Sequence, residues 1–408
     1  MTIGIDILAY LGIFFGLYFS IFILGTFWEN KEKVYKKPQS SRLPSISLIV
    51  PCYNEEKNIG KTIASLLLLD YPKDKLEIIV VDDGSTDNTF YRAKAFEKYG
   101  IKVFHKPNGG KHTALNLGIE NTRAELVACL DADSQPHPQS LKRIVKCFGD
   151  PKVMAAISTV KISRAKNIIE GVQYVEFLIA AFLKKIYSVL DSVFVTPGPL
   201  SVVRREAFKK IGAYRKGHQT EDLEFGFRLQ RANYKIVHAL DSIVYTAPCP
   251  TFASLLRQRL RWRRGLILNL KDYPDLLNFR RHGNLAFLLF YNLLGSFLSV
   301  GILSYAVWQL ADFILQKTNN LFLIGVHLPR LSASFSFFSV NLKPTIILGA
   351  VSIAVFMFYL VFSRRLTADS KPIKKDTLSY ILLYTFLNAL FWISAIFSAL
   401  FKKDVYWK

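Results

Sequence analysis

Four long runs without charged residues limit how this chain can fold. The first covers residues 7–28, and three more lie near residues 285–310, 345–363 and 378–401. Each is about as long as the 20 apolar residues that a helix needs to cross a bilayer. The first run lacks the basic start and the small-residue cleavage site of a secretory signal. We therefore expect membrane helices at both ends of the chain and a polar domain between them.

The basic residues indicate which side of the membrane this domain occupies. The sequence has 53 Lys and Arg against 31 Asp and Glu, a formal charge of +22. Many of these basic residues stand beside the apolar runs, at 31–42, 257–264 and 364–375. Basic loops stay on the cytosolic side and attract anionic lipids. We expect a multi-pass protein of the cell membrane with a cytosolic domain. We expect its positive charge to contact the bilayer surface, and we do not expect it to bind nucleic acid.

The last apolar run does not fit this rule as a simple span. If the loop 364–375 is cytosolic, a full crossing by residues 378–401 would place Lys402 and Lys403 outside. Either the charge rule is broken there, or the run does not fully cross. The segment 321–340 is interrupted by charged residues and a proline, so we interpret it as interfacial or re-entrant.

The middle of the chain alternates short β-branched runs with helical patterns. Strands are expected near 45–50, 76–81, 101–104 and 126–130, and helices near 55–69, 88–99 and 111–120. This alternation is typical of a mostly parallel, Rossmann-like sheet with helices on both faces. The predicted fold class is α/β. Ligands of such sheets bind at the carboxyl ends of the strands.

Polar clusters follow these predicted strands. Asp131 and Asp133 leave one strand as alternate residues, so both carboxylates can hold one divalent cation, Mg²⁺ or Mn²⁺, that bridges two phosphates. Lys111 follows two glycines at a helix start and can add charge and N–H groups. Asp82 or Asp83 can accept hydrogen bonds from a nucleobase. Each cluster is also ordinary turn or helix-cap chemistry, but their recurrence at successive strand ends favours a nucleotide-sugar site.

A strongly basic helical pattern covers residues 251–270. On a 3.6-residue period, Gln258, Arg261 and Trp262 share one face. An aromatic ring beside guanidinium groups suits a sugar ring next to a diphosphate. The alternative is a helix that only lies on an anionic membrane surface.

In this order, the motifs resemble those of membrane-integrated family 2 glycosyltransferases with a GT-A domain, the group that includes cellulose, chitin, hyaluronan and poly-N-acetylglucosamine synthases. The resemblance runs from about residue 45 to residue 272. It implies a membrane helix (1–28), a basic linker (29–44), a GT-A domain (45–250), interfacial helices (251–283) and a membrane region (284–408). The amphipathic stretch 164–190 is then either a core helix or a helix at the membrane interface.

The resemblance assigns donor-side roles. It implies that Asp82 and Asp83 bind the base, that Lys111 binds the diphosphate, and that Asp131 and Asp133 form the DxD metal site. Residues 258–262 match the QxxRW-type motif. Gln258 and Arg261 are then expected at the diphosphate, and Trp262 is expected to stack on the terminal sugar of the acceptor.

Two further segments are assigned to the acceptor side. Residues 194–200, FVTPGPL, have prolines and a glycine that fix an irregular backbone or a plain turn. The resemblance places the acceptor there, at Thr196, Gly198 and Pro199. Glu221 and Asp222 open a helical run, which is also ordinary first-turn chemistry. By resemblance Glu221 faces the acceptor and Asp222 is the catalytic base that deprotonates its hydroxyl.

The implied activity is inverting, metal-dependent transfer from a UDP-sugar to a glycan or a lipid-linked acceptor. The first hypothesis is a processive polysaccharide synthase, and the second a non-processive transferase. The Gly-Pro pair is closer to chitin and hyaluronan synthases, whereas Thr-Glu-Asp is closer to cellulose and poly-N-acetylglucosamine synthases, so the product stays open. A third hypothesis, a transporter or scaffold with a degenerate domain, is disfavoured because the acidic set is intact and the spans lack charges.

Overall fold

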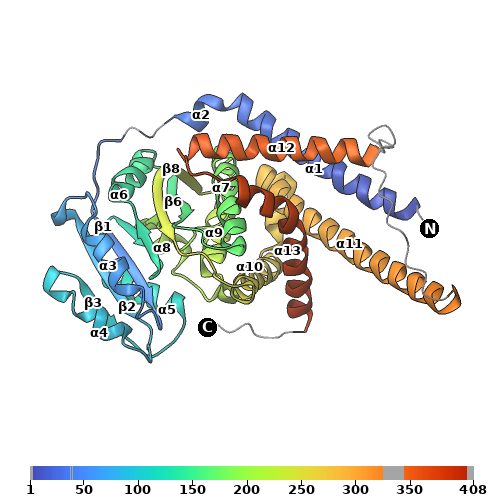
Figure 1. Ribbon diagram of the computed structural model, residues 1–408. Helices are drawn as coiled ribbons and strands as arrows, with labels where there is room; N and C mark the ends of the chain where they lie inside the picture. Colours follow the sequence, from blue (N-terminus) through green and yellow to red (C-terminus); the bar gives the residue numbers. More distant parts are fainter. Residues whose placement is uncertain (1–2, 37, 39, 325–343, 402–408) are drawn as a thin grey trace.

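The computed structural model describes residues 3–36, 38, 40–324 and 344–401 (Figure 1). In this part of the chain, a sheet lies at one end of the molecule, and long helices extend away from it. The strands are β1 Ile46–Cys52, β2 Leu76–Asp82, β3 Lys102–His105, β4 Leu126–Cys129, β5 Ser134–Pro136, β6 Val153–Ile162, β7 Ser201–Arg204 and β8 Lys235–Thr246. The helices are α1 Ile3–Glu29, α2 Lys31–Tyr35, α3 Ile59–Leu67, α4 Thr89–Lys94, α5 Lys111–Glu120, α6 Ser140–Ile144, α7 Ile168–Val189, α8 Arg205–Ile211, α9 Glu221–Arg231, α10 Phe252–Asp272, α11 Phe279–Ile324, α12 Pro344–Leu366 and α13 Lys374–Leu400.

The strands form one sheet in the order β3-β2-β1-β4-β7-β6-β8-β5. Strands β3, β2, β1 and β4 pair in parallel, as do β6 and β8. Strand β7 is antiparallel to both β4 and β6, and β5 is antiparallel to β8. The predicted α/β class with a mostly parallel sheet is confirmed, and the four predicted strands agree with β1 to β4 to within a few residues.

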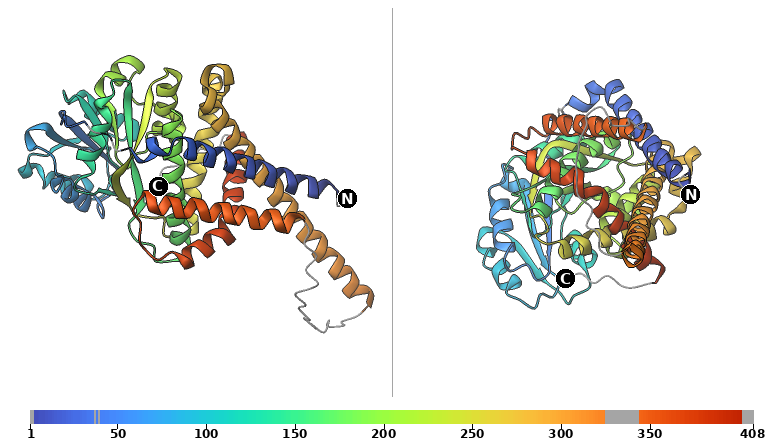
Figure 2. Two further views of the ribbon diagram at one scale, coloured as in Figure 1. Left: turned by 90° about the horizontal axis from the view of Figure 1, so that it is seen from above. Right: turned by 45° about the vertical axis from the view of Figure 1, so that its right-hand side comes forward.

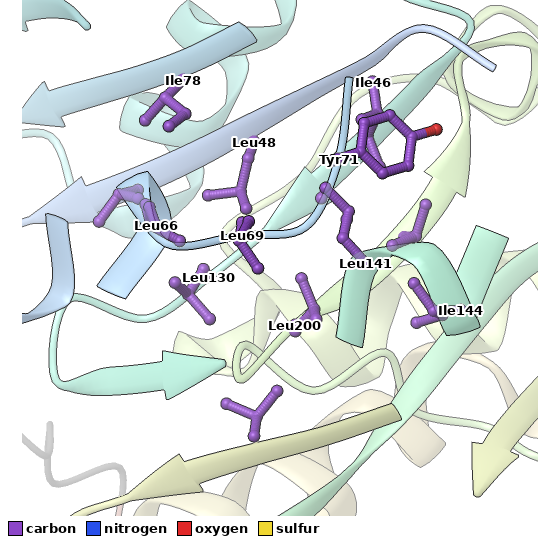
Figure 3. Packing of buried hydrophobic residues seen from close by; sticks show 14 of the residues in the cluster. Ile46, Leu48, Leu66, Leu69, Tyr71, Ile78, Leu130, Leu141, Ile144 and Leu200 are labelled. Carbon is purple, nitrogen blue, oxygen red and sulfur yellow. The ribbon is translucent and has the colours of Figure 1, made fainter. Parts of the chain in front are cut away.

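Strand β1 explains why its sequence is apolar without alternation. All seven of its residues are buried, because helices cover both faces of the sheet. Leu48 packs on one face with Leu66 and Leu69 (Figure 3). Ile49 packs on the other face against α5, where a Cβ on Gly118 would lie 2.6 Å from the Ile49 side chain. Burial of each such side chain stabilises the folded state by roughly 2 kcal/mol.

The parallel register places the polar clusters at one edge of the sheet. Cys52 at the end of β1 is paired with Asp82 at the end of β2, and Ile49 is paired with Cys129 at the end of β4. The residues that follow β2 and β4, including Asp83 and Asp131, therefore leave the sheet at the same edge.

Four of the described helices are long and apolar enough to cross a membrane, namely α1, α11, α12 and α13. In Figure 1 and in the left view of Figure 2, α1, α11 and α12 extend away from the sheet, and α1 contacts both of the others. Helix α13 runs across their direction and packs on α7 and α10. Beyond Ile324, the predicted re-entrant segment 321–340 lies outside the described residues.

Helix α7 lies between the sheet and the long helices, because it packs against β6, β8, α12 and α13. The loop between α12 and α13 is tied to the domain at the same place. Tyr174 of α7 donates a hydrogen bond to Asp369 Oδ1 at 2.7 Å, and Lys161 of β6 lies 3.6 Å from Asp369 Oδ2. The end of α12 and the start of α13 are thus fixed on the side of the domain.

Candidate active site

Lys111, the first residue of α5, holds the centre of the candidate site together. Its Nζ lies 2.6 Å from Asp131 Oδ1 and 3.2 Å from Glu221 Oε1. Burial lowers the pKa of Lys111, but the carboxylates of Asp131 and Glu221 outweigh it and hold the pKa well above its usual range. A permanently charged ammonium therefore joins the end of β4 to the start of α9.

The two aspartates after β4 have different surroundings. The Asp131 N–H donates to the Gly198 carbonyl at 3.2 Å, and a Cβ on Gly198 would lie 2.2 Å from Asp131 Oδ1. Burial raises the pKa of Asp133 to about 6, with further contributions from the negative charges of Asp131 and Glu55. A nearby positive charge would therefore stabilise the ionised carboxylate of Asp133.

The segment 194–200 and α9 are packed backbone to backbone. Thr196 donates to the Asp222 carbonyl from its N–H at 3.2 Å and from its hydroxyl at 3.0 Å. A Cβ on Gly226 would lie 2.4 Å from the Phe194 carbonyl oxygen. Pro199, half-buried, follows Gly198 beside Asp131. The two predicted acceptor-side segments therefore form one wall of the site.

The acids at the start of α9 titrate differently. Burial raises the pKa of Glu221, but Lys111 and then Arg261 lower it more, so the net pKa lies below its ordinary value. Burial, followed by the charge of Glu221, raises the pKa of Asp222 to about 6, although Lys111 and Arg261 oppose this. Glu221 is therefore ionised throughout the neutral range, whereas Asp222 changes charge near its lower end.

Helix α10 fixes the loop that precedes α9. Asn269 donates to the Gly217 carbonyl and to the Thr220 hydroxyl, both at 3.0 Å, and Arg261 Nη1 donates to the Gln219 carbonyl at 2.8 Å. Gly265 allows the close approach, because a Cβ there would lie 2.4 Å from Thr220 Oγ1. Thr220 precedes α9 but makes no side-chain cap; its hydroxyl donates to Gly217 instead. The basic helix is therefore part of the candidate site.

The remaining residues of the motif on α10 lie close to one another. Trp262 is 37% exposed, and Gln258 is half-buried and accepts a hydrogen bond from Arg259. Arg259 was not among the predicted site residues, and it is buried.

Asp82 and Asp83 have partners of their own in this structure. Asp82 is fully buried, with His105 Nδ1 at 2.7 Å from its Oδ2. Asp83 binds Lys106 Nζ at 2.6 Å and accepts from the N–H groups of Gly109 and Gly110, which precede Lys111. Asp83 thus shapes the glycine loop before α5, and a role of either acid in binding a base stays a prediction. Sequence reasoning missed His105 and Lys106, although they follow a predicted strand directly.

The donor set fits a divalent cation that is only partly held by protein. The charges of Asp131, Glu221, Lys111 and Arg261 all affect the pKa of Asp222. The charges of Asp131 and Lys111 also affect the pKa of Asp133. Among the described residues, no three His, Cys, Asp or Glu side chains are grouped closely enough to hold a metal. Mg²⁺ commonly takes one or two carboxylates and completes its shell with water and phosphate oxygens. Asp131 and Asp133 would be those two carboxylates.

A model of the glycosyl transferase family 2 matches residues 47–212. This range contains β1 to β4, Lys111 and both aspartates after β4. This part of the chain therefore matches a family 2 glycosyltransferase domain, and the predicted resemblance to the glycosyltransferases is confirmed.

Among curated relatives, the poly-β-1,6-N-acetyl-D-glucosamine synthase of Staphylococcus epidermidis is 29% identical over 265 residues, which cover 62% of this chain and 64% of that protein. The synthase of Staphylococcus aureus (strain COL) is 28% identical over 266 residues, with the same coverage. The match thus spans less than two thirds of the length of these synthases.

Among solved structures, the mannosyltransferase PcManGT from Pyrobaculum calidifontis, in complex with GDP-Man and Mn²⁺, has a TM-score of 0.62 and 19% identity. The match covers 96% of this chain and all of that chain. The likeness confirms the GT-A fold and extends to the long apolar helices.

Gly198→Ala tests the close approach on which Asp131 depends. We expect the new methyl group to displace the Asp131 carboxylate and to lower transferase activity at least tenfold, while the protein still folds. Sugar transfer is measured by release of the nucleotide, and folding by thermal unfolding of the purified protein. Gly60→Ala is the matched control, because nothing lies within 4 Å of a Cβ there. Full activity in Gly198→Ala would contradict the predicted role of this contact.

Proposed function

We propose that this protein is an inverting transferase that moves N-acetylglucosamine from UDP-N-acetylglucosamine to the end of a β-linked N-acetylglucosamine chain at the cytosolic face of the membrane. The observation that carries the proposal is the ammonium of Lys111 between Asp131 and Glu221, because it joins the predicted donor and acceptor sides. The names of the staphylococcal relatives support the choice of sugar.

Each step of the reaction would then use a group of this chain. A divalent cation on Asp131 and Asp133 would stabilise the negative charge of the departing diphosphate. Lys111 and Arg261 would bind the same diphosphate, because both are cations beside the acidic cluster. Asp222 would accept the proton of the acceptor hydroxyl as that hydroxyl attacks the sugar. The exposed ring of Trp262 would stack on the terminal sugar of the acceptor.

The pKa of Asp222 predicts how the rate depends on pH. A general base acts only when it is ionised, so we expect kcat to be constant above the pKa near 6 and to fall about tenfold per unit below it. The measurement is kcat between pH 5 and 8 at saturating donor, acceptor and cation. Because Asp133 also titrates near 6, the profile is repeated at tenfold higher cation, which should move only an Asp133 limb. A flat profile down to pH 5, or a limb that follows the cation, would rule out Asp222 as the titrating base.

The proposed activity is tested with a panel of donors. We expect detergent-solubilised protein to release UDP from UDP-N-acetylglucosamine in the presence of Mg²⁺ or Mn²⁺ and to lose at least a hundredfold in rate with Asp131→Asn or with EDTA. UDP-glucose and GDP-mannose are the control donors, and mass spectrometry gives the product length. Faster turnover of a control donor would refute the sugar assignment, and unchanged activity in EDTA would refute the metal. Products longer by one sugar only would favour the non-processive alternative.

We further propose that α1, α11 and α12 span the membrane and that α13 lies on its cytosolic face. The support comes from the packing of α13 along α7 and α10, and from Trp392, near its end, which packs with Leu285 and Leu289 at the domain end of α11. A helix on the surface also keeps Lys402 and Lys403 on the cytosolic side, so the charge rule is obeyed. The exposed Leu378 and Leu382 would face the acyl chains.

This topology is tested with single cysteines and a membrane-impermeant thiol reagent. We expect Leu400→Cys to react in inverted vesicles and not in intact cells, like the control Ser370→Cys in the loop before α13. Gln316→Cys, at the far end of α11, should show the opposite pattern. Cys52, Cys129 and Cys147 are buried, and Cys249→Ser removes the only half-buried one of the four. Labelling of Leu400→Cys from outside the cell would show that α13 crosses.

A further inference from the structure

Arg259 is a charged side chain buried in the middle of the motif on α10. It is 1% exposed and is the largest of the fully buried side chains in the described residues. Its neighbours along the helix, Gln258 and Trp262, were assigned to the donor and to the acceptor, whereas Arg259 itself had no role. Burying a guanidinium requires a close counter-charge, because the loss of hydration is large.

The counter-charge comes from α7. Arg259 Nη2 lies 2.6 Å from Glu176 Oε2, with the side chains 2% and 18% exposed. The other side of the same guanidinium meets the motif: Nη1 donates to Gln258 Oε1 at 2.5 Å, and the guanidinium carbon lies 4.2 Å from the centroid of the Trp262 ring. One cation therefore contacts both the amide and the indole.

Helix α13 completes this arrangement. The hydroxyl of Tyr384 donates to Glu176 Oε1 at 3.3 Å, so the second oxygen of the carboxylate also has a partner. Four residues further along α13, Asn388 accepts from Arg263 Nη2 at 3.0 Å, and the Arg263 guanidinium lies 4.7 Å from the Trp392 ring. α13 thus contacts α7 at Glu176, the partner of Arg259, and α10 at Arg263, the residue after Trp262.

We propose that the Glu176–Arg259 ion pair is a positioning device that holds Gln258 and Trp262 in one fixed arrangement toward the two substrates. The inference rests on the proposed roles of these two side chains. Glu176 fixes one edge of the guanidinium. The other edge then restricts the Gln258 amide, and the flat face restricts the Trp262 indole. Arg259 is a positioning residue, because it acts through its neighbours.

Stability alone does not account for this pair. A buried ion pair can often be replaced by apolar side chains of similar volume without loss of stability. An apolar side chain could not donate to the Gln258 amide oxygen, and it would lack the charge that attracts the face of the indole. A lysine keeps the charge but loses the flat fork that makes both contacts at once. The chemistry of arginine therefore suits the orientation of two neighbours.

The test separates positioning from a general structural effect through the acceptor KM. We expect Arg259→Lys to raise the KM for a short β-linked N-acetylglucosamine oligosaccharide about tenfold, with a smaller change in the KM for UDP-N-acetylglucosamine, because Lys111 and Arg261 also bind the donor. Arg257→Lys is the matched control, since Arg257 is exposed on the same helix. Tyr384→Phe removes only the hydroxyl and should change the acceptor KM in the same direction, by about two- to threefold.

A double-mutant cycle with Trp262→Ala decides the interpretation. If Arg259 acts through the indole, Arg259→Lys should have no further effect on the acceptor KM once Trp262 is alanine. The same tenfold effect in both backgrounds would overturn the inference, even if Trp262→Ala alone is impaired. An unchanged acceptor KM in Trp262→Ala alone would instead remove the proposed acceptor role, and this inference with it. The two failures are thus distinguished by the single variant.

Discussion

The candidate site depends on one contact between charges that are far apart in the sequence. The Lys111 ammonium lies between a carboxylate after β4 and another at the start of α9. Without it, Asp131 and Glu221 would be two partly buried negative charges facing each other. The contact therefore joins the parallel half of the sheet, where nucleotides bind in this fold class, to the helix α9, which packs against α10. It also leaves an excess of negative charge that suits a divalent cation.

Close backbone packing keeps this contact in place. Gly198, Gly226 and Gly265 each allow a neighbour that a side chain would exclude, at Asp131, at the 194–200 segment and at Thr220. Because these contacts join different elements, no element in the wall of the site can move without displacing its neighbour. α10 carries this order further, because it packs against both α9 and α13. The packing of α10 against α13 therefore also affects the geometry of the site.

Much of this could be predicted from the sequence, for physical reasons that differ along the chain. Strands β1, β2 and β4 were predictable because both faces of the sheet are covered there and their sequences are largely apolar, whereas β3 lies at the edge of the sheet and is only partly buried. Strands β5 to β8 were not predicted: β5 has three residues and β7 has four, and β6 and β8 contain polar residues such as Ser158 and His238. Asp131 and Lys111 were predicted because they stand at the end of a strand and at the start of a helix, whereas Glu221 was predicted by resemblance. That the three meet in one cluster depends on tertiary packing, which no local pattern contains.

Arg259 shows where periodicity is an incomplete guide. The helical pattern predicts Gln258, Arg261 and Trp262 on one face, and it assigns no role to Arg259. The structure buries it because α7 presents Glu176, a lone acid within the apolar stretch from Val172 to Leu183. An acid in such a stretch is unfavourable unless a cation meets it, so Glu176 was the available signal that a basic residue of another helix must pack there. Glu176 predicts that its partner is basic, but it does not predict which residue this is. α10 offers five arginines as candidates, namely Arg257, Arg259, Arg261, Arg263 and Arg264. Only the tertiary packing selects Arg259 as the partner of Glu176, and that packing places the buried charge next to the two side chains it can orient.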